Sequence, residues 1–196
     1  MGEERWNHNT HYHRLALRHA PGARTALDVG CGEGLLTRRL RAAGVPSVTG
    51  VDADADQVAR ARAHADSDGL HYLLGDALDV PHDGRFDLVT CVATLHHLDL
   101  RAGLRRLASL TAPGGHLVVV GLAAVRTPAD ALLSVAAVPV AAVVDRARGT
   151  WEHGSPVTDP REAYGEVRDT ARALLPGVRW RRHLYWRYSL TWRAPA

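Results

Sequence analysis

Short apolar runs alternate with amphipathic runs from residue 25 to residue 122, and this alternation restricts the fold more than any other feature of the chain. Apolar runs of this length are typical of strands that are buried on both faces of a parallel sheet. The runs with this character are 25–30, 47–52, 71–76, 86–93 and 116–122. Because helix-like runs separate most of them, the sequence predicts an α/β fold with a doubly wound, mostly parallel sheet.

The helix-like runs cover 34–44, 55–65 and 100–110. The last of them places four leucines on one helical stripe, namely Leu100, Leu104, Leu107 and Leu110. The tail 178–193 instead alternates large and charged residues with a period of two, which predicts a final antiparallel strand pair. We therefore expect a seven-stranded sheet with helices on both faces.

Length and composition predict one globular domain over 1–196, because 46% of the residues are hydrophobic and 23% are charged. The start of the chain lacks the basic and apolar regions of a secretory signal, and Cys31 and Cys91 are too few for a disulfide framework. These two features predict a cytoplasmic protein. No run reaches the roughly 18 apolar residues of a spanning helix, so we expect no membrane span.

All 24 basic residues are arginine, and the net charge is +3. The excess is concentrated in 161–196, which holds eight arginines but only Glu162, Glu166 and Asp169 as acids. A basic face of this kind can bind nucleic acid or an anionic small molecule. It can equally be a solvated strand surface, and we favour this interpretation because the excess is small.

The first predicted strand runs into "ALDVGCGEG", where Gly30, Gly32 and Gly34 form a G-x-G-x-G loop. Such a loop lets the backbone approach a ligand closely. A dinucleotide fingerprint would need a third glycine where Leu35 stands. Asp28 precedes the first glycine, and its carboxylate suits a cationic ligand better than a pyrophosphate.

Two further acids follow strands of the same predicted sheet. Asp52 ends the second strand about twenty residues after the glycine loop, where an acid typically binds ribose hydroxyls. Asp76 ends the third strand. Three acids and no lysine predict a ligand with a ribose, a positive charge and no phosphates, and S-adenosylmethionine fits this description. The alternative role for each acid is that of a helix N-cap.

Five segments, in order and at family-like spacing, carry a resemblance to the class I S-adenosylmethionine-dependent methyltransferases. They are "LDVGCGEG", "VTGVDAD", "GDALDVP", "FDLVTCVATLHHL" and "APGGHLVVVG", and they span 25–122. The resemblance implies a Rossmann-like methyltransferase fold with S-adenosylmethionine as the cofactor. It covers a little over half of the chain and says much less about the acceptor.

The resemblance also implies roles for residues around the methionine portion of the cofactor. Gly30, Cys31 and Gly32 would line this portion with their backbone, and Asp28 would lie near it and act through water. Val92 would offer a backbone carbonyl to the cofactor's amine.

For the nucleoside portion, the resemblance implies four further contacts. Asp52 would hold the ribose diol, and Ala53 would lie on the adenine face. Asp76 would accept a hydrogen bond from the adenine amino group, with the Ala77 backbone beside it.

Methyl transfer is an in-line displacement that requires alignment and, for a protonated nucleophile, a base. The exit of the fourth strand reads "ATLHHL" and places His96 and His97 there, with His96 the preferred base. The alternative is that one histidine packs and the other is solvated. The Asn- or Asp-Pro-Pro-aromatic motif of relatives that act on nucleic-acid amines is missing here. We therefore expect a small-molecule acceptor rather than nucleic acid.

The N-terminal stretch "WNHNTHYH" (6–13) has three explanations: a metal site, a surface without a role, or a lid over the reaction. No cysteine or carboxylate obviously completes a zinc site with its histidines, so we expect no metal. The family places a helix here, and we expect 1–22 to form a lid helix in which Tyr12 and His13 are candidate catalytic residues. An amphipathic helix that covers the sheet edge is the alternative.

The resulting organisation is a lid helix (1–22), a cofactor-binding core (25–122), an acceptor-side insertion (123–160) and a C-terminal helix with a strand pair (161–196). The Ala/Val-rich run 131–144 predicts an apolar or aromatic acceptor, although a homodimer face would give the same pattern. The protein is thus expected to be a monomer or a homodimer. The alternatives to a small-molecule methyltransferase are an enzyme for RNA or peptides and a non-catalytic, cofactor-binding partner subunit.

Overall fold

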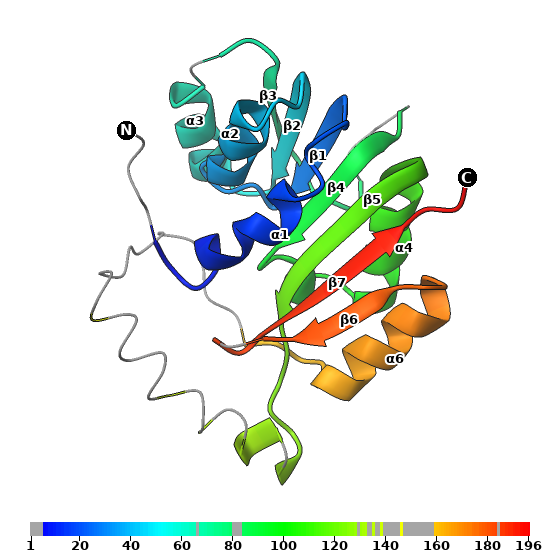
Figure 1. Cartoon of the computed structure of the whole chain (residues 1–196). Coiled ribbons are helices and arrows are strands. Elements are labelled where there is room, and N and C mark those ends of the chain that lie inside the picture. The colour runs from blue at the N-terminus through cyan, green and yellow to red at the C-terminus, as the bar shows by residue number, and fades with distance from the viewer. Residues whose placement is uncertain are drawn as a thin grey trace.

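A seven-stranded sheet with the order β3-β2-β1-β4-β5-β7-β6 forms the centre of the computed structural model (Figure 1). The structure describes residues 6–65, 67–79, 84–128, 130–132, 135, 138, 146, 159–183 and 185–196. The strands are β1 (Thr25–Val29), β2 (Ser47–Asp52), β3 (Leu70–Leu74), β4 (Phe86–Val92), β5 (Thr111–Leu122), β6 (Arg179–Arg182) and β7 (Arg187–Arg193). β1 to β5 pair in parallel, whereas β7 is antiparallel to both β5 and β6. The predicted fold class, with its antiparallel C-terminal pair, is confirmed.

Helices cover both faces of this sheet (Figure 1). The helical elements are η1 (Thr10–Tyr12), α1 (His13–Leu17), α2 (Leu35–Ala42), α3 (Ala55–Ala63), η2 (Leu95–His97), α4 (Leu100–Leu110) and α6 (Tyr164–Leu174). α1 and α2 pack on one face in a cluster with Leu88 and Val118, while α4 and α6 share the opposite cluster with Leu117 and Val119. Successive β5 residues therefore point to opposite buried faces, as the continuous apolar run predicted.

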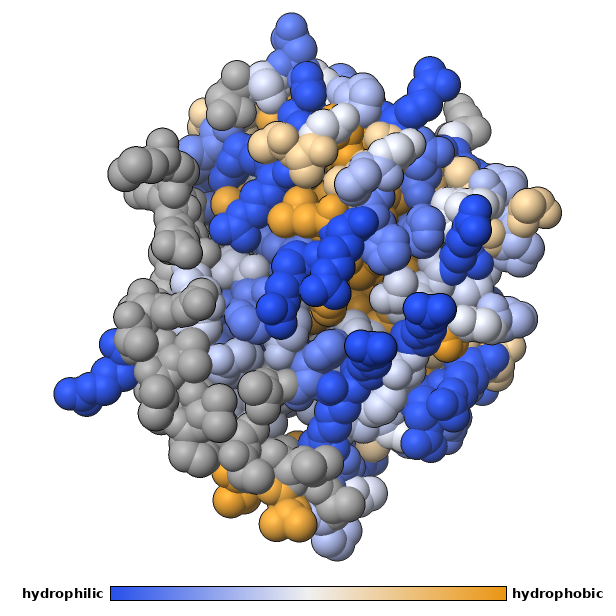
Figure 2. Space-filling model, viewed as in Figure 1, coloured by the Kyte–Doolittle hydropathy of each residue, from blue (hydrophilic) through white to orange (hydrophobic). Residues whose placement is uncertain are grey.

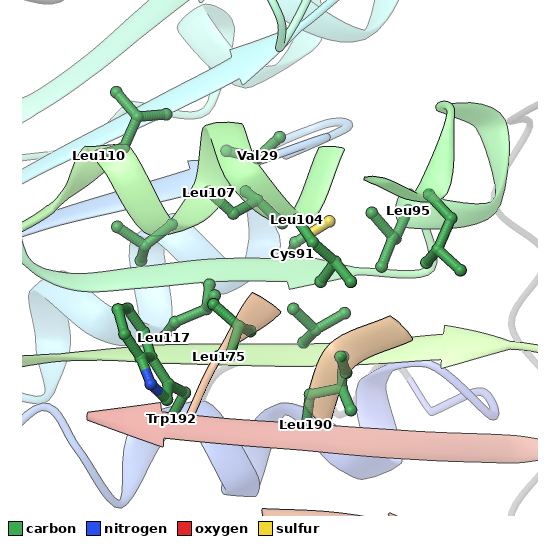
Figure 3. Close-up of a cluster of buried hydrophobic side chains, with 14 of the residues drawn as sticks. Val29, Cys91, Leu95, Leu104, Leu107, Leu110, Leu117, Leu175, Leu190 and Trp192 are labelled. Carbon is green, nitrogen blue, oxygen red and sulfur yellow. The ribbon is translucent and has the colours of Figure 1, made fainter. Parts of the chain in front are cut away.

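The predicted leucine stripe of α4 is confirmed. All four of its leucines are buried against the central strands (Figure 3), and Asp99 caps the helix by accepting a hydrogen bond from the Ala102 amide at 2.8 Å. The leucine stripe faces Val29, Cys91 and Leu117 of three neighbouring strands.

Two local expectations differ from the structure. The segment 112–115, whose sequence "APGG" predicts a turn before the strand 116–122, is part of β5, and the register between β4 and β5 shifts between Phe86 and Leu88 to accommodate it. A Cβ at Gly115 would lie 2.9 Å from the Asp87 carbonyl, so glycine permits this close pairing. The N-terminal helix is also shorter than expected, because the Asn7 side chain accepts the Asn9 and Thr10 amides and so turns the chain before η1.

The insertion predicted at 123–160 lies largely outside the described residues, as does most of 131–144. At its start, the apolar side chains of Val125, Leu132, Val135 and Val138 are exposed. Figure 2 shows apolar surface at the lower edge of the view, where Figure 1 places the beginning of this segment. Within the described ranges, no helix has both the length and the apolar character needed to cross a membrane.

Candidate active site

The carboxyl ends of the parallel strands meet at one edge of the sheet, and the glycine loop is fixed there. The Gly30 and Cys31 amides donate to the Val51 carbonyl at 2.8 and 3.0 Å, so the β1–α2 loop is held against the end of β2. The Cys31 side chain turns inward, and its Sγ lies 2.8 Å from the position of a Cβ on Gly50. Burial raises the pKa of Cys31, which keeps it a thiol at neutral pH.

Two separate features of the structure require glycine at position 30. Its φ of 72° lies in the left-handed region, and a Cβ there would be 1.9 Å from the Thr94 hydroxyl oxygen. The loop therefore touches the exit of β4. Gly34 shows the same combination, with a φ of 79° and a Cβ position 2.5 Å from the Tyr72 hydroxyl.

Asp52 is oriented by the backbone around it. One carboxylate oxygen accepts the Gly32 amide at 2.7 Å, and the other accepts the Asp54 amide at 3.0 Å. The N-cap of α3 is Asp54, whose side chain accepts the Asp56 and Gln57 amides. Asp54, and not Asp52, is therefore the N-cap of α3. Asp52 instead links the glycine loop to the end of β2.

The next two predicted residues extend this edge toward β3. The Gly75 amide donates to the Asp52 carbonyl at 2.9 Å, which brings the residue after Gly75, Asp76, to the same edge. Asp76 is exposed and accepts the Leu78 amide at 2.8 Å. Ala53 is exposed and Ala77 is partly buried, and the side chain of Ala77 packs against the cluster on the α4 face.

Asp28 is the buried acid of the site. It lies opposite Thr90 in the β1–β4 register, and the Thr90 hydroxyl donates to its carboxylate at 2.7 Å. Burial raises the pKa of Asp28 to about 7, an effect that the Thr90 hydrogen bond opposes and the negative charge of Asp52 reinforces. Among the described residues no cation pairs with Asp28, so this carboxyl can gain much from a positively charged ligand.

The chain leaves β4 through a strained turn. The Val92 carbonyl accepts the Thr94 hydroxyl at 3.1 Å, and the Ala93 amide donates to the Val120 carbonyl at 2.7 Å. Ala93 has a φ of 55°, an unusual value for a residue with a Cβ. Strain of this kind often occurs at functional sites. The turn places Thr94 against the glycine loop at Gly30.

The donor set fits S-adenosylmethionine. The buried, cation-free Asp28 matches a ligand with an ammonium and a sulfonium, and Asp52 presents carboxylate oxygens at the strand end where a ribose diol is usually held. The glycine loop supplies close backbone approach.

Comparison with known proteins agrees with this chemistry. Residues 27–119 match the family model described as a methyltransferase domain. An uncharacterized methyltransferase of Mycobacterium bovis is 40% identical over 98% of this chain and 99% of its own length. The chain belongs to the S-adenosylmethionine-dependent methyltransferases.

Two further matches are a relative of similar sequence and a solved structure of similar fold. A ubiquinone biosynthesis O-methyltransferase of Cronobacter sakazakii is 40% identical over 46% of this chain and 39% of its own length. The crystal structure of a putative S-adenosylmethionine-dependent methyltransferase from Listeria monocytogenes has a TM-score of 0.69 and 14% identity, and the match covers 96% of this chain and 98% of that one. At this identity the structural match shows the fold. S-adenosylmethionine is thus the cofactor of this methyltransferase.

His96 and His97 lie on η2 with ring centroids 4.1 Å apart. His97 is exposed, whereas His96 is partly buried and its Nδ1 has no hydrogen-bond partner among the described residues. Burial lowers the pKa of His96 to about 4, and the charges of His97 and Arg187 act in the same direction. His96 is therefore neutral at physiological pH, and its Nδ1 is unsatisfied.

The N-terminal stretch forms an aromatic cluster over the ends of β4 and β5. Trp6 and Tyr12 are buried with Val120 and Tyr185, and Val92 packs against the same group. The His8 ring stacks on Tyr185 at 4.4 Å. We call Trp6, Tyr12, Val120 and Tyr185 the aromatic cover. Burial raises the pKa of Tyr12 to about 12, so its hydroxyl keeps its proton.

His13 faces α2 instead. It is buried, and its Nδ1 lies 3.1 Å from Nη1 of Arg39. Burial, together with the Arg39 charge, lowers the pKa of His13 to about 3, so the ring is neutral. Over the described part of the chain, no group of three or more His, Cys, Asp or Glu side chains is arranged to hold a metal ion.

Several residues of this site were not predicted from the sequence. Thr90 and Thr94 contact Asp28 and the glycine loop only because of the β1–β4 register and the strained β4 exit. Arg187 is one of the eight arginines of the basic tail, and no local signal separates it from the exposed ones. The period-two pattern of the tail places Arg187 on the polar face of its strand together with Ser189, yet the structure buries both residues.

Proposed function

We propose that this methyltransferase transfers the methyl group of S-adenosylmethionine to a small-molecule acceptor. The observation that carries this proposal is the aromatic cover, which packs Trp6 and Tyr12 against the ends of β4 and β5. A cover held at the acceptor side suits a ligand small enough to lie beneath it. Its aromatic side chains favour an apolar or aromatic acceptor.

The relatives and the distribution of charge also support a small-molecule acceptor. The relative from Cronobacter sakazakii carries the name of an O-methyltransferase of ubiquinone biosynthesis, which supports a small acceptor. Two of the eight arginines of the tail do not contribute to an exposed basic face, because Arg182 pairs with Asp130 and Arg187 is buried. An acceptor made of nucleic acid would require exposed cations that track phosphates.

We assign the cofactor contacts to the residues at the strand ends. Asp28 compensates the positive charge, Asp52 holds the ribose diol, and the glycine loop approaches the methionine portion with its backbone. Asp76 and Ala77 line the adenine. When bound, S-adenosylmethionine supplies an electrophilic methyl group on a positively charged sulfur.

Catalysis by the chain then consists of alignment, exclusion of water and removal of one proton. The aromatic cover excludes water from the acceptor side. His96 takes up the acceptor's proton at Nδ1, which requires the neutral tautomer with hydrogen on Nε2. A pKa of about 4 makes this a weak base in the absence of ligand. Negative charge brought by an acceptor would strengthen it.

Titration calorimetry followed by turnover assays tests the proposal. We expect heat on titration with S-adenosylmethionine and none with NADH. We then expect S-adenosylhomocysteine formation with at least one member of a panel of phenols, catechols, amines and thiols. Cofactor binding without any turnover would favour a partner subunit. Methylation confined to bulk tRNA, and lost between about 50 and about 200 mM salt, would favour an RNA enzyme.

The histidine pair provides a matched test of the base. His96→Gln should lower turnover at least tenfold with unchanged cofactor affinity, whereas His97→Gln, at the exposed neighbour, should leave both nearly unchanged. Equal effects of the two substitutions would contradict the assignment.

A further inference from the structure

A buried arginine without an acid partner lies on the acceptor side of the site. Arg187 begins β7 opposite Leu122, at the end of β5, and is only 9% exposed. Its guanidinium donates to the Asn9 side-chain oxygen from Nε at 3.0 Å and from Nη2 at 2.7 Å, and to the Tyr185 carbonyl from Nη1 at 2.9 Å. All three contacts are with neutral oxygens.

Arg187 combines burial with the lack of an acid, whereas the ion-paired arginines of the described residues are more exposed. Arg182, Arg38 and Arg168 each pair with a carboxylate. Buried charges are normally paired, because a lone buried charge forfeits its hydration without compensation. Burial lowers the pKa of Arg187 to about 10, so the guanidinium is still charged at neutral pH. Within the described ranges its positive charge has no counter-ion.

The hydrogen-bonding capacity of Arg187 is also incompletely used. A guanidinium has five N–H groups, and the contacts with Asn9 and Tyr185 occupy three of them. One N–H on each Nη remains without a partner in the described part of the chain. Two neighbouring N–H groups at a fixed distance match the two oxygens of a carboxylate.

Side chains from two other elements lie in the electrostatic field of Arg187. Its charge contributes to the lowered pKa of His96, whose Nδ1 is unpartnered. It has a smaller effect on Tyr164, the first residue of α6, whose ring centroid lies 3.9 Å from Cζ of Arg182. η2 and β7 therefore each hold a buried side chain with N–H or ring nitrogen positions that lack a partner among the described residues.

The strand order separates this region from the acids of the cofactor site. β7 is three strands away from β1 in the sheet, which corresponds to about 14 Å at the usual spacing of about 4.8 Å. Arg187 is thus displaced from Asp28 toward the acceptor side. Asn9 and Tyr185 orient the guanidinium. Tyr185 belongs to the aromatic cover, and Asn9 lies in the chain between its members Trp6 and Tyr12.

We propose that Arg187 binds a carboxylate of the methyl acceptor and so selects aromatic or apolar acids as substrates. This inference rests on the proposed small-molecule methyl transfer and deepens it. The carboxylate would take the two remaining N–H groups of the guanidinium, while the apolar part of the acceptor would lie against the aromatic cover. The acceptor's nucleophilic atom would then face His96.

Binding of acid and amide pairs tests this proposal without requiring the true substrate. The probes are benzoate, phenylacetate and hexanoate, each beside its amide, titrated into the full-length protein saturated with S-adenosylhomocysteine. We expect at least one acid to bind tenfold or more tightly than its amide. Arg187→Gln should abolish this preference, Arg187→Lys should retain part of it, and both should bind S-adenosylhomocysteine with unchanged affinity.

The control is Arg179→Gln, which removes an exposed arginine from β6 of the same sheet and should leave the acid preference intact. Thermal unfolding checks that each variant folds, and Arg187→Lys keeps the buried charge should the Gln variant not fold.

The proposal is overturned if no acid is preferred over its amide, or if Arg187→Gln weakens acid and amide equally. A parallel loss of S-adenosylhomocysteine affinity would also overturn it, since Arg187 would then serve the cofactor. The proposed function fails separately, if the wild-type protein binds no cofactor.

Discussion

Replacing Asp28 by Asn should change how the stability of the protein depends on pH. The carboxyl is buried with Thr90 as its hydrogen-bond donor, and an Asn side-chain oxygen at the same place can accept the same hydrogen bond. The substitution therefore removes the titration and keeps the shape and the contact. Because the folded-state pKa of about 7 exceeds the ordinary value of 3.8, the folded protein binds this proton more tightly than the unfolded chain does.

The sign and the size follow from these two values. Stability from the protonated Asp28 is fully present below pH 3.8 and is lost as the pH rises toward 7. At about 1.36 kcal/mol for each pH unit, the whole interval corresponds to about 4 kcal/mol. Between pH 5 and pH 7.5 the wild-type protein should therefore lose about 2.5 kcal/mol of unfolding free energy relative to the Asn variant.

Urea unfolding of both proteins at several pH values measures this difference, because the remaining groups titrate in both and cancel in the comparison. Asp79→Asn, at an exposed position, controls for the loss of one negative charge. If the gap between wild type and Asp28→Asn stays constant from pH 5 to pH 7.5, the argument that burial raises the pKa of Asp28 is wrong.

Three further predictions concern the same site. Because a cationic ligand favours the ionised form of Asp28, wild-type affinity for S-adenosylmethionine should rise by up to roughly tenfold per pH unit between pH 5 and 7, and calorimetry should find a flat profile in Asp28→Asn. Gly30→Ala places a methyl group 1.9 Å from the Thr94 hydroxyl at a φ of 72°, so it should cost roughly 2 kcal/mol of stability and most of the cofactor affinity; wild-type values in thermal unfolding and calorimetry would refute the close contact. Tyr12→Phe should lower turnover far more than cofactor affinity, and unchanged turnover in steady-state assays would remove Tyr12 from the catalytic candidates.

The fold was largely predictable because its signals are local. Each buried strand is an apolar run, each helix shows its own apolar stripe, and the antiparallel pair shows a period of two. The positions of Asp28 and Asp52 were predictable for the same reason, since the carboxyl ends of parallel strands meet at one edge whatever the side chains do. The segment 112–115 shows the limit: its glycines and proline are typical of a turn, but it lies within β5 as an irregularity between the β4-paired residues Thr111 and His116.

Tyr12 and His13 show what local sequence patterns could not predict. In the sequence, Tyr12 and His13 are equivalent members of one polar aromatic stretch. In the structure, Tyr12 joins the aromatic cover, and His13 turns toward Arg39 on α2. Which way a ring points depends on the neighbours that the fold supplies, and these lie 26 residues away for His13.

Patterns among consecutive residues are enough to predict the α/β class, the glycine loop and the acids that follow the strands, because periodicity and strand ends are local features. The hydrogen bond from Thr90 to Asp28 and the burial of Arg187 without an acid become visible only once the chain has folded. Both depend on the pairing of segments distant in the chain, and burial sets the energy of a charge only once those segments have met.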